Sequence, residues 1–259
     1  MTIQRVLSKK AKTDALLADR KLKDHVPLTR TMDRETLREM LHKYGMIYVK
    51  PVGGTFGRGV IRVEYSPGSP DVYQFQSEEN KFRFHDFDSM YDSLLIVKRK
   101  TSYLAQQGIE LLKYRKRRFD LRVMVQRNPK GHWETTGIIG RLAHPRKIVT
   151  NYHSGGTPMA IEILIAEHLR GHTTISAYRQ KLGSLGVEVA RALERRFPRI
   201  QEIGVDVAVD QNLKPWILEV NTLPDPFIFR KLKDRSAFRR IYRYAVAYGR
   251  FRKRLSRRS

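Results

Sequence analysis

The first half of the chain alternates between apolar spacings typical of helices and short apolar runs typical of strands. Apolar residues three and four positions apart predict helices over 31–44 and 87–100. Runs rich in β-branched and aromatic residues predict strands over 46–51, 60–65, 72–75 and 103–109. Pro51 ends the first of these strands. This half therefore mixes helices and strands.

The second half is richer in strands. Two β-forming runs, 118–128 and 133–143, flank the turn-forming residues between them and predict a hairpin. After a glycine-rich loop, regularly spaced leucine and valine residues predict a long helix over 174–196. A second hairpin is expected within 204–224, around a polar turn. We therefore expect two hairpins separated by a helix.

The C-terminal stretch predicts an amphipathic helix. Its apolar face collects Phe238, Ile241, Tyr242, Ala245 and Tyr248. Its other face is basic, and we expect Arg239, Arg240, Arg243 and Arg250 to face solvent. The helix is therefore expected to dock through its apolar stripe and to leave a positive surface exposed.

Three polar residues interrupt the apolar strands of the hairpin at 204–224. Glu219 and Asn221 lie two positions apart and project from one face of a strand, and Asp206 in an antiparallel partner can lie opposite them. Two carboxylates and an amide oxygen suit Mg²⁺. A salt-bridged polar sheet face is the alternative. Unpaired carboxylates are costly to bury, which favours the metal site.

A lysine and a glycine-rich stretch follow the strand at 46–51. Lys50 stands near the strand end, and the glycines are Gly53, Gly54, Gly57 and Gly59. Glycines let backbone N–H groups approach an anion closely, and the lysine adds a fixed positive charge. The spacing matches neither of the common phosphate-binding motifs, G-x-x-x-x-G-K-[ST] and G-x-G-x-x-G. A phosphate-binding loop and a ligand-free hairpin turn are therefore both open interpretations.

Charged residues also occur in the hairpin at 118–143. Arg122 and Arg141 suit phosphate or carboxylate because a guanidinium donates two parallel hydrogen bonds. Asp120 lies two positions before Arg122, so pairing between sheet neighbours is the alternative. The following loop supplies Asn151 and His153, and a histidine in such a loop is more often an ordinary surface residue than a base or ligand.

Charge and composition narrow the class of partner. The 259 residues include 51 Lys and Arg against 26 Asp and Glu, a formal net charge of +25. Such a balance favours nucleic acid, an anionic membrane surface or an acidic protein. No apolar run approaches the ~20 residues that cross a bilayer, and the N-terminus lacks the apolar segment of a signal peptide. The absence of cysteine excludes disulfides and thiolate zinc sites, and suits a cytosolic location.

In combination, the motifs resemble those of the ATP-grasp superfamily. In order they are Lys50 with its glycine loop, QQGI at 106–109, DLR at 120–122, GR at 140–141, TNYHSGG at 150–156, GVD at 204–206 and LEVNTLP at 218–224. The middle and C-terminal motifs are similar to those of RimK-type glutamate ligases. The stretches MLHKYGMIYVKPVGGTFGRGVIRV, QQGIEL and FDLRVMVQ resemble the YheC/YheD family of endospore-coat-associated ATP-grasp proteins. The resemblance runs from about Lys12 to Arg230.

This resemblance implies an α+β ATP-grasp fold, in which two α+β subdomains hold ATP between two antiparallel sheets. The implied segments are an N-terminal linker or helix over 1–30, an N-subdomain with the glycine loop over 31–108, a C-subdomain with the metal ligands over 109–230 and a basic amphipathic helix over 231–259. We expect no full pre-grasp domain ahead of the first subdomain, and therefore an acceptor site that is open or completed by a partner.

The resemblance also implies residues that bind ATP. Lys50 would hold the α- and β-phosphates, and Lys12 would be an earlier phosphate-binding lysine. The loop that closes over the phosphates would contain Gly53, Gly54, Thr55, Phe56, Gly57 and Gly59. The adenine-side hinge would be Gln106, Gln107, Gly108 and Ile109.

Metal and catalytic residues follow from the same resemblance. Asp206, Glu219 and Asn221, here called the metal-ligand set, would hold two Mg²⁺ ions, with Mn²⁺ as a substitute. Arg122 and Arg141 would stabilise the transferred phosphoryl group or the acyl phosphate. Asn151 would lie beside the acceptor.

The implied function is an ATP- and Mg²⁺-dependent carboxylate–amine ligase that forms an acyl phosphate, acts on a protein or peptide and is associated with the spore coat. A phosphotransferase on the same fold and a non-catalytic nucleotide-binding or interaction protein are the alternatives. An acidic protein or peptide acceptor is expected to meet the basic C-terminal helix. Nucleic acid is less favoured, because the aromatic residues there have a helical spacing typical of burial. The implied location is the bacterial cytoplasm, in the mother cell or at the spore coat.

Overall fold

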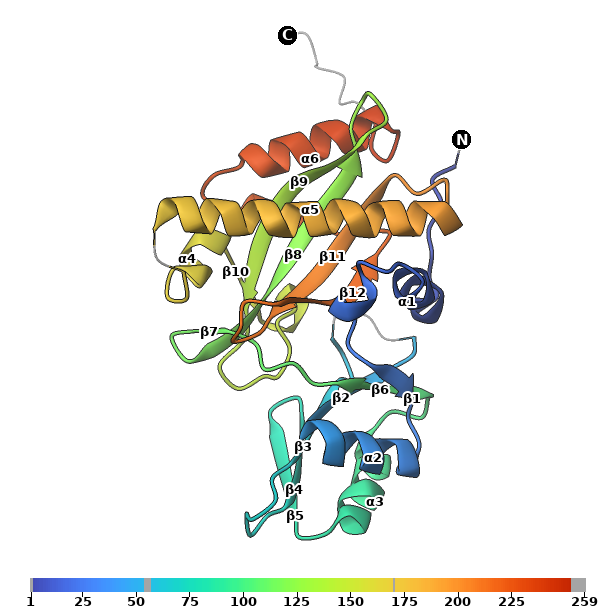
Figure 1. Cartoon of the computed structure of the whole chain (residues 1–259), viewed down its shortest axis with the longest axis vertical. Coiled ribbons are helices and arrows are strands. Elements are labelled where there is room, and N and C mark those ends of the chain that lie inside the picture. Colours follow the sequence, from blue (N-terminus) through green and yellow to red (C-terminus); the bar gives the residue numbers. More distant parts are fainter. Residues whose placement is uncertain (1, 54–56, 170, 253–259) are drawn as a thin grey trace.

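Two antiparallel sheets, one above the other in Figure 1, organise the chain. The computed structural model describes residues 2–53, 57–169 and 171–252. The first sheet has the order β1-β6-β2-β3-β4-β5. Its strands are β1 (Thr29–Thr31), β2 (Met46–Pro51), β3 (Ile61–Tyr65), β4 (Tyr73–Ser77), β5 (Asn80–Phe84) and β6 (Tyr103–Gln107). Every neighbouring pair is antiparallel.

Two helices cover the first sheet, α2 (Arg34–Tyr44) and α3 (Phe87–Val97). Asp33 begins α2 by accepting a hydrogen bond from the backbone N–H of Thr36 at 2.7 Å. Asp86 begins α3 in the same way, accepting from the backbone N–H of Ser89 at 2.8 Å. Both helices agree with the predicted ones, although each is about three residues shorter than expected.

The apolar pattern does not predict β5, a polar strand at the outer edge of the first sheet. Asn80, Lys81 and Arg83 are exposed because one side of an edge strand faces solvent. Pairing defines the strand instead. Ser77 of β4 lies opposite Asn80, and Glu78 in the turn between them adopts a φ of 52°.

The second sheet has the order β10-β9-β8-β11-β12, with β7 paired to β8. Its strands are β7 (Lys113–Tyr114), β8 (Arg117–Arg127), β9 (Trp133–Leu142), β10 (Thr157–Met159), β11 (Glu202–Val209) and β12 (Pro215–Asn221). The shorter elements around it are α1 (Lys9–Leu17), α4 (Ile161–Ile165) and the 3₁₀ turns η1 (Lys23–His25), η2 (Tyr152–Ser154) and η3 (Phe227–Lys231). The two predicted hairpins are β8–β9 and β11–β12.

Side-chain alternation along β8 divides the second sheet into two faces. Val123 and Val125 pack in the core beneath α5 (His172–Arg196), where a methyl group on Gly186 would come within 2.9 Å of each valine. Met124 points the other way, into a small core formed with η3 and α6 (Ser236–Ala247). Asp120 and Arg122 share the face of Met124, so the polar residues of β8 lie opposite α5.

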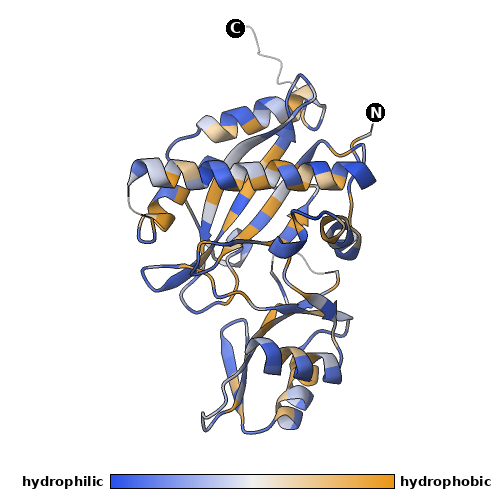
Figure 2. Cartoon of the chain, viewed as in Figure 1, coloured by the Kyte–Doolittle hydropathy of each residue, from blue (hydrophilic) through white to orange (hydrophobic). Residues whose placement is uncertain are grey.

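Apolar residues concentrate on the strands of the second sheet and on the helix faces that meet them, as Figure 2 shows. On α5 the predicted stripe is buried, namely Leu182, Leu185, Val189 and Leu193. Within the described part of the chain, no helix is long and apolar enough to cross a bilayer.

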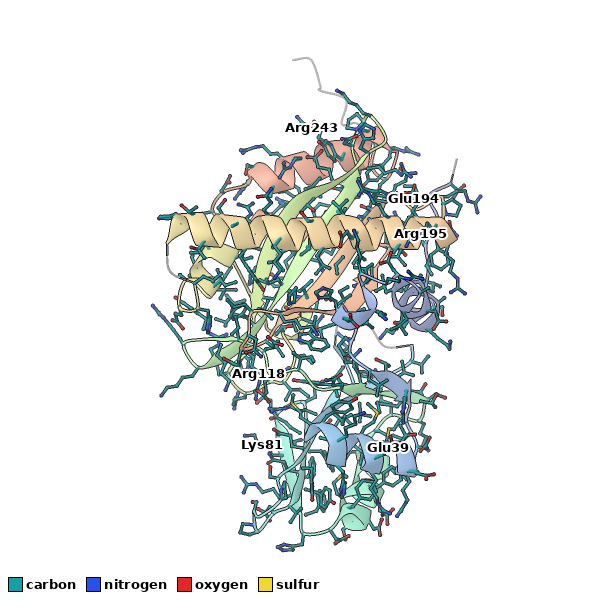
Figure 3. The ribbon with its side chains drawn as sticks, in the orientation of Figure 1. Glu39, Lys81, Arg118, Glu194, Arg195 and Arg243 are labelled. Atoms are coloured by element: carbon teal, nitrogen blue, oxygen red, sulfur yellow. The ribbon has the colours of Figure 1, made fainter. Side chains whose placement is uncertain are left out.

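The C-terminal helix docks largely as predicted. On α6, Ile241 and Ala245 are buried, Phe238 and Tyr242 are half-buried, and Tyr244, which the pattern did not single out, is buried as well. Arg239 and Arg243 are exposed, and Arg243 projects from the outer side of the helix in Figure 3.

Two arginines expected to face solvent contact distant strands, although Arg240 still exposes 39% of its side chain. Arg240 donates two hydrogen bonds to the backbone carbonyl of Thr136 on β9, at 3.0 and 3.2 Å. Arg250 places its guanidinium 2.8 Å from the carboxylate of Glu202, and only 12% of its side chain is exposed. The prediction is wrong for Arg250 and holds only in part for Arg240, because helical spacing does not reveal hydrogen-bond acceptors on distant strands.

Glu202 of β11 joins both ends of the described chain. Its carboxylate is fully buried and lies 2.8 Å from a guanidinium nitrogen of Arg5 and of Arg250, while the hydroxyl of Tyr248 donates to it at 2.6 Å. We call these four residues the Glu202 cluster. Arg5 also donates to the backbone carbonyl of Thr222, and Arg250 to that of Pro224 at 2.9 Å. The cluster therefore ties both ends to the segment that follows Asn221.

Candidate functional site

A cleft opens between the two sheets, on the face of the second sheet that carries Asp120. Loops from both sheets close its sides. The polar residues that line it are Lys9, Lys50, Arg58, Gln106, Gln107, Asp120, Arg141, Thr150, Asn151, Asp206 and Glu219. Of the site residues that the sequence predicted, the cleft brings together Lys50, Gly57, Gln106, Gln107, Ile109, Arg141, Asn151, Asp206 and Glu219. Lys12, Arg122 and Asn221 are not among its lining residues.

The hairpin β11–β12 places two members of the metal-ligand set side by side. Asp206 lies directly opposite Glu219, and Gly204 lies opposite Asn221. Glu219 and Asn221, two positions apart, project from the same face of β12. A register shift after Asp206 marks a β-bulge at this point, a feature that often accompanies functional sites.

These oxygen donors fit a hard divalent cation. Mg²⁺ beside phosphates is usually held by one or two carboxylates, and keeps water and phosphate oxygens as its other ligands. Among the described residues, no three His, Cys, Asp or Glu side chains gather closely enough to hold a metal by themselves. A cation between Asp206 and Glu219 would therefore need Asn221, water or phosphate to complete its shell.

Two arginines hold Asp206. Arg122 donates to both of its carboxylate oxygens, at 2.5 and 3.1 Å, and Arg141 comes within 3.2 Å of it while pairing with Asp120 at 2.5 and 2.8 Å. Burial opposes the ionised carboxylate, but the two guanidinium groups outweigh it and hold the pKa of Asp206 below its usual value. Burial likewise opposes the charge on Arg141, yet Asp120 and Asp206 raise its pKa.

Gly204 makes the contact between Arg122 and Asp206 possible. A methyl group at position 204 would lie 2.7 Å from the Cβ of Pro224 and 3.0 Å from the Cδ of Arg122. Any side chain there would push Arg122 or the segment after Asn221 out of place. Close contact with Arg122 and Pro224 therefore explains why a glycine stands two residues before Asp206.

Three lysines converge beside Glu219, Lys50 from β2 and Lys9 and Lys12 from α1. Lys9, Lys12 and Lys50 line a smaller cavity that adjoins the cleft, together with Gln106 and Glu219. Lys50 donates to the side-chain oxygen of Gln106, and burial lowers its pKa to about 8, opposed by the nearby charge of Glu219. Burial also lowers the pKa of Lys12. Converging cations of this kind suit a polyanion such as a triphosphate.

The glycine-rich stretch meets the second sheet. Gly57 and Gly59 have φ angles of +73° and +76°, a conformation that favours glycine. A methyl group on Gly57 would lie 2.5 Å from the Oδ1 atom of Asn151, so this loop touches the loop after β9. Gly53 has open space around it, and the predicted ligands Gly54, Thr55 and Phe56 lie outside the described residues.

The predicted hinge passes between the sheets. A methyl group on Gly108 would lie 2.7 Å from the backbone carbonyl of Met46, which accepts a hydrogen bond from the N–H of Gly108 at 2.9 Å. Gln107 lines the cleft and accepts from the N–H of Leu28 at 3.3 Å. Ile109 is buried and forms part of the apolar wall of the cleft.

The loop after β9 is held in a tight turn beside Asn151. A methyl group on Gly156 would lie 2.0 Å from the backbone carbonyl of Thr150, so only glycine fits there. The N–H of Gly156 donates to the backbone carbonyl of Asn151 at 3.0 Å. The last glycine of the N-x-x-x-G-G motif therefore allows the tight turn of the loop that places Asn151 in the cleft.

A charged contact joins the two sheets beside this loop. Glu79 and Glu78, at the tip of the β4–β5 hairpin, pair with Arg146 at 3.0 Å and with Lys147 at 3.4 Å. Gln76 donates to the backbone carbonyl of Arg146 at 2.7 Å. We call this contact the hairpin clamp, and it links the first sheet to the segment that leads to Asn151.

The motifs did not point to several residues of the cleft. Lys9 lies 3.8 Å from Glu219. The only feature of the sequence that could have indicated its role is its position three residues before Lys12, which places both lysines on one side of a helix. Ile148 and Leu218 line the cleft with Ile109, but apolar residues in strands and loops look like ordinary core positions. Contacts of this kind depend on the approach of two sheets, which sequence spacing does not encode.

Two sheets that enclose a cleft lined by converging lysines and opposed carboxylates define an ATP-grasp protein. Solved structures with a similar fold include carboxyaminoimidazole ribonucleotide synthase from Aspergillus clavatus complexed with ATP, at a TM-score of 0.52 and 13% identity, covering 85% of this chain and 46% of that one. N5-carboxyaminoimidazole synthase from Aspergillus clavatus, in complex with ADP and 5-aminoimidazole ribonucleotide, gives a TM-score of 0.50 at 11% identity, covering 93% of this chain and 52% of that one. At such identities the likeness concerns the fold.

The chain belongs to the YheC/D-like ATP-grasp family, which matches residues 1–251. Among its relatives in Bacillus subtilis, the endospore coat-associated protein YheD is 26% identical over 199 residues, which cover 75% of this chain and 43% of YheD. The endospore coat-associated protein YheC is 19% identical over 201 residues, which cover 77% and 55%. The chain thus spans about half the length of these relatives.

Proposed function

We propose that this protein is an ATP- and Mg²⁺-dependent carboxylate–amine ligase. One observation supports this proposal most: Lys50 lies across the cleft from the pair Asp206 and Glu219. Cationic side chains close to oxygen ligands in one cleft suit a nucleoside triphosphate with its metal ion. Family membership supports binding of ATP, and the ligase chemistry rests on the residues that surround this cleft.

Each group in the cleft has a proposed role. Lys50 and Lys12 would bind the α- and β-phosphates, and the hinge at 106–109 would lie at the adenine side. Asp206, Glu219 and Asn221 would hold Mg²⁺, which when bound supplies charge neutralisation and alignment of the phosphates. Arg141 and Arg122 would stabilise negative charge on the transferred phosphoryl group.

The proposed reaction has two steps. An oxygen of the acceptor carboxylate attacks the γ-phosphorus of ATP, a new P–O bond forms, the bond to the bridging oxygen breaks and ADP leaves. The nitrogen of an amine then attacks the acyl carbon, a C–N bond forms, and phosphate leaves as the amine loses a proton to solvent. Asn151, in the loop beside the glycine-rich stretch, would position the acceptor.

We further propose that the acceptor is an acidic protein or peptide, in the setting of the spore coat. The exposed residues Arg239 and Arg243 on α6 attract polyanions over a Debye length of about 8 Å at physiological salt. The names of YheC and YheD place those relatives at the endospore coat, which supports the same setting here.

Product analysis tests the ligase reaction. The protein is incubated with ATP labelled at the γ-phosphate, Mg²⁺, an acidic peptide and hydroxylamine as a general amine, with Glu219→Ala as the matched control. We expect equal amounts of ADP, free phosphate and hydroxamate, and loss of all three in the variant. A stable phosphorylated peptide would instead support a phosphotransferase, and ATP binding without ADP formation would support a non-catalytic protein.

A further inference from the structure

Three large apolar side chains are exposed close to residues of the proposed site. The exposed fractions are 36% for Tyr152, 60% for Leu223 and 44% for Phe227. Tyr152 follows Asn151, which lines the cleft, and Leu223 comes two residues after Asn221. Single exposed apolar residues are common on protein surfaces, but a group of them often marks a binding surface.

All three side chains are placed around η3: Tyr152 lies beside its last residue, Phe227 is its first residue, and Leu223 precedes it by four positions. The Nζ atom of Lys231, the last residue of η3, lies 5.7 Å from the ring centre of Tyr152. Phe227, the first residue of η3, has its ring 6.0 Å from that of Phe238 and 5.8 Å from that of Phe251. We call the surface formed by Tyr152, Leu223, Phe227, Phe238 and Phe251 the η3 platform.

The charge around the η3 platform is strongly positive. Residues 227–239 contain five basic residues and one acidic residue. Within the described chain, none of these five forms an ion pair with a carboxylate, and Arg230 instead lies 5.6 Å from the ring centre of Phe238. The nearby acidic side chains are already engaged, since Asp225 accepts from the N–H of Phe227 and Asp234 from the N–H of Ser236, both at 2.8 Å.

We infer that the η3 platform is the docking surface of a polypeptide acceptor in which aliphatic side chains alternate with acidic ones. This inference rests on the proposed ligase function and specifies its substrate. Leu223 and Phe227 would bury an aliphatic side chain, while the basic residues of 227–239 would hold the acidic side chains beside it. An acidic side chain that neighbours the anchored one would then reach toward Asn151.

The aromatic geometry favours a polypeptide over single-stranded nucleic acid. Base stacking requires a ring with an open face. Phe227 has a ring neighbour within about 6 Å on two sides, and Tyr242 stacks on Phe251 at 5.3 Å with 14° between the ring planes. Rings that cover one another offer edges and grooves, which suit an aliphatic side chain better than a base.

Binding of two matched peptides tests this inference without any turnover. Fluorescent peptides of three Glu-Glu-Leu-Gly repeats and of three Glu-Glu-Ser-Gly repeats have equal charge and differ only in the apolar residue. We expect the leucine peptide to bind about tenfold more tightly by anisotropy, since each buried leucine contributes to the apolar contact. Arg230→Gln with Lys231→Gln should weaken both peptides at low salt and have little effect at 0.5 M salt (about a 4 Å Debye length).

Matched variants distinguish binding at the η3 platform from non-specific binding to exposed apolar residues. Leu223→Ser, alone and with Phe227→Ser, should reduce the affinity for the leucine peptide to that for the serine peptide and leave ATP affinity unchanged. Leu95→Ser with Ile96→Ser removes two other exposed apolar residues, on α3, and should change neither peptide.

Several outcomes would overturn the inference. They are equal binding of the two peptides, unchanged binding by Leu223→Ser, or tighter binding of a single-stranded oligonucleotide that is lost in the same variant. Because the readout is peptide binding, failure here with normal hydroxamate formation would reject the platform alone. Normal peptide binding with no ADP formation would reject the ligase and keep the platform.

Discussion

At the scale of single residues, the candidate site consists of buried charges that neutralise one another. Asp120 and Asp206 face Arg122 and Arg141, two negative charges against two positive ones, and all four side chains are at most 10% exposed. Glu219 is held more loosely, 36% exposed and 3.8 Å from Lys9. Of the two carboxylates in the metal-ligand set, it is therefore the one that a cation can reach with less rearrangement.

Replacing Glu219 tests the metal site with little disturbance to the fold. We expect Glu219→Ala to lower turnover at least ~100-fold and to reduce the effect of Mg²⁺ on ATP binding. Calorimetric titration of ATP with and without Mg²⁺ measures this effect. Glu162→Ala, which removes an exposed ion pair with Arg179, serves as the control. ATP binding that is equally tight with and without Mg²⁺ in the unaltered protein would contradict the metal site.

The lowered pKa of Lys50 predicts that nucleotide binding depends on pH. Burial lowers the pKa of this ammonium to about 8, so it carries its charge below pH 8 and loses it as the pH rises. We expect ATP affinity to fall between pH 7 and pH 9. Lys50→Arg should remove most of this dependence because a guanidinium stays charged, and Lys50→Met should bind weakly throughout. Equal affinity of Lys50→Met and the unaltered protein would mean that the glycine loop is only a turn.

At the scale of elements, strong periodicity was the most reliable guide. The long helix α5 and the hairpins β8–β9 and β11–β12 follow from buried stripes and turn residues that are local in sequence. The polar edge strand β5 has no such signal, because its pairing with β4 defines it. Thr136, the partner of Arg240, and Glu202, a partner of Arg250, are likewise more than 40 residues away along the chain, beyond any local pattern.

In the candidate site too, the sequence predicted residues that belong to local motifs better than contacts between distant residues. Ordered motifs located Lys50, Asp206 and Glu219, which line one cleft in the structure. The pairing of Arg122 with Asp206 and of Arg141 with Asp120 is the pairing between sheet neighbours that the sequence left open as the alternative. No motif indicated that Lys9 reaches Glu219 from α1, because that contact depends on how the helix packs beside β12.

The hairpin clamp predicts a salt-dependent contribution to closure of the cleft. Its ion pairs are largely exposed, so each contributes only about 0.2–1 kcal/mol. We expect Glu78→Lys with Glu79→Lys to weaken ATP binding about two- to fivefold at low salt, and to have little effect at 0.5 M salt. Combining Glu79→Arg with Arg146→Glu should restore affinity. If the restored pair binds no better than either single variant, the clamp does not act through these charges.

At the scale of the whole molecule, the Glu202 cluster connects the ends of the described chain to the proposed metal site. Glu202 lies four residues before Asp206 on β11, and its partners Arg5 and Arg250 hold the backbone at Thr222 and Pro224. Burial next to Glu202 also raises the pKa of the Tyr248 hydroxyl, which therefore keeps its proton and donates. The position of Asn221 thus depends on contacts from distant parts of the chain.

Glu202→Gln should loosen this connection. Removing the charge leaves two partly buried arginines without their carboxylate, so we expect a loss of about 3–5 kcal/mol in the free energy of unfolding. We also expect a weaker apparent affinity for Mg²⁺ in the presence of ATP, measured below the lowered melting temperature.

Glu134→Gln is the matched control. Glu134 also accepts from a tyrosine hydroxyl, Tyr244 at 2.9 Å, and faces an arginine, Arg240 at 3.6 Å, but it lies on β9 away from Asn221. Its replacement should lower stability less and leave Mg²⁺ affinity unchanged. Equal loss of Mg²⁺ affinity in both variants would show that stability alone explains the effect.

The Glu202 cluster also sets an order of events during synthesis. A ribosome produces Arg5 early, then Glu202 and Asn221, and only later Arg250. Until Arg250 and Tyr248 have emerged, the carboxylate of Glu202 has one cationic partner in place of two, and the segment after Asn221 lacks one of its two anchors. The nascent chain can therefore form the first sheet and its helices well before the proposed metal site acquires its final shape.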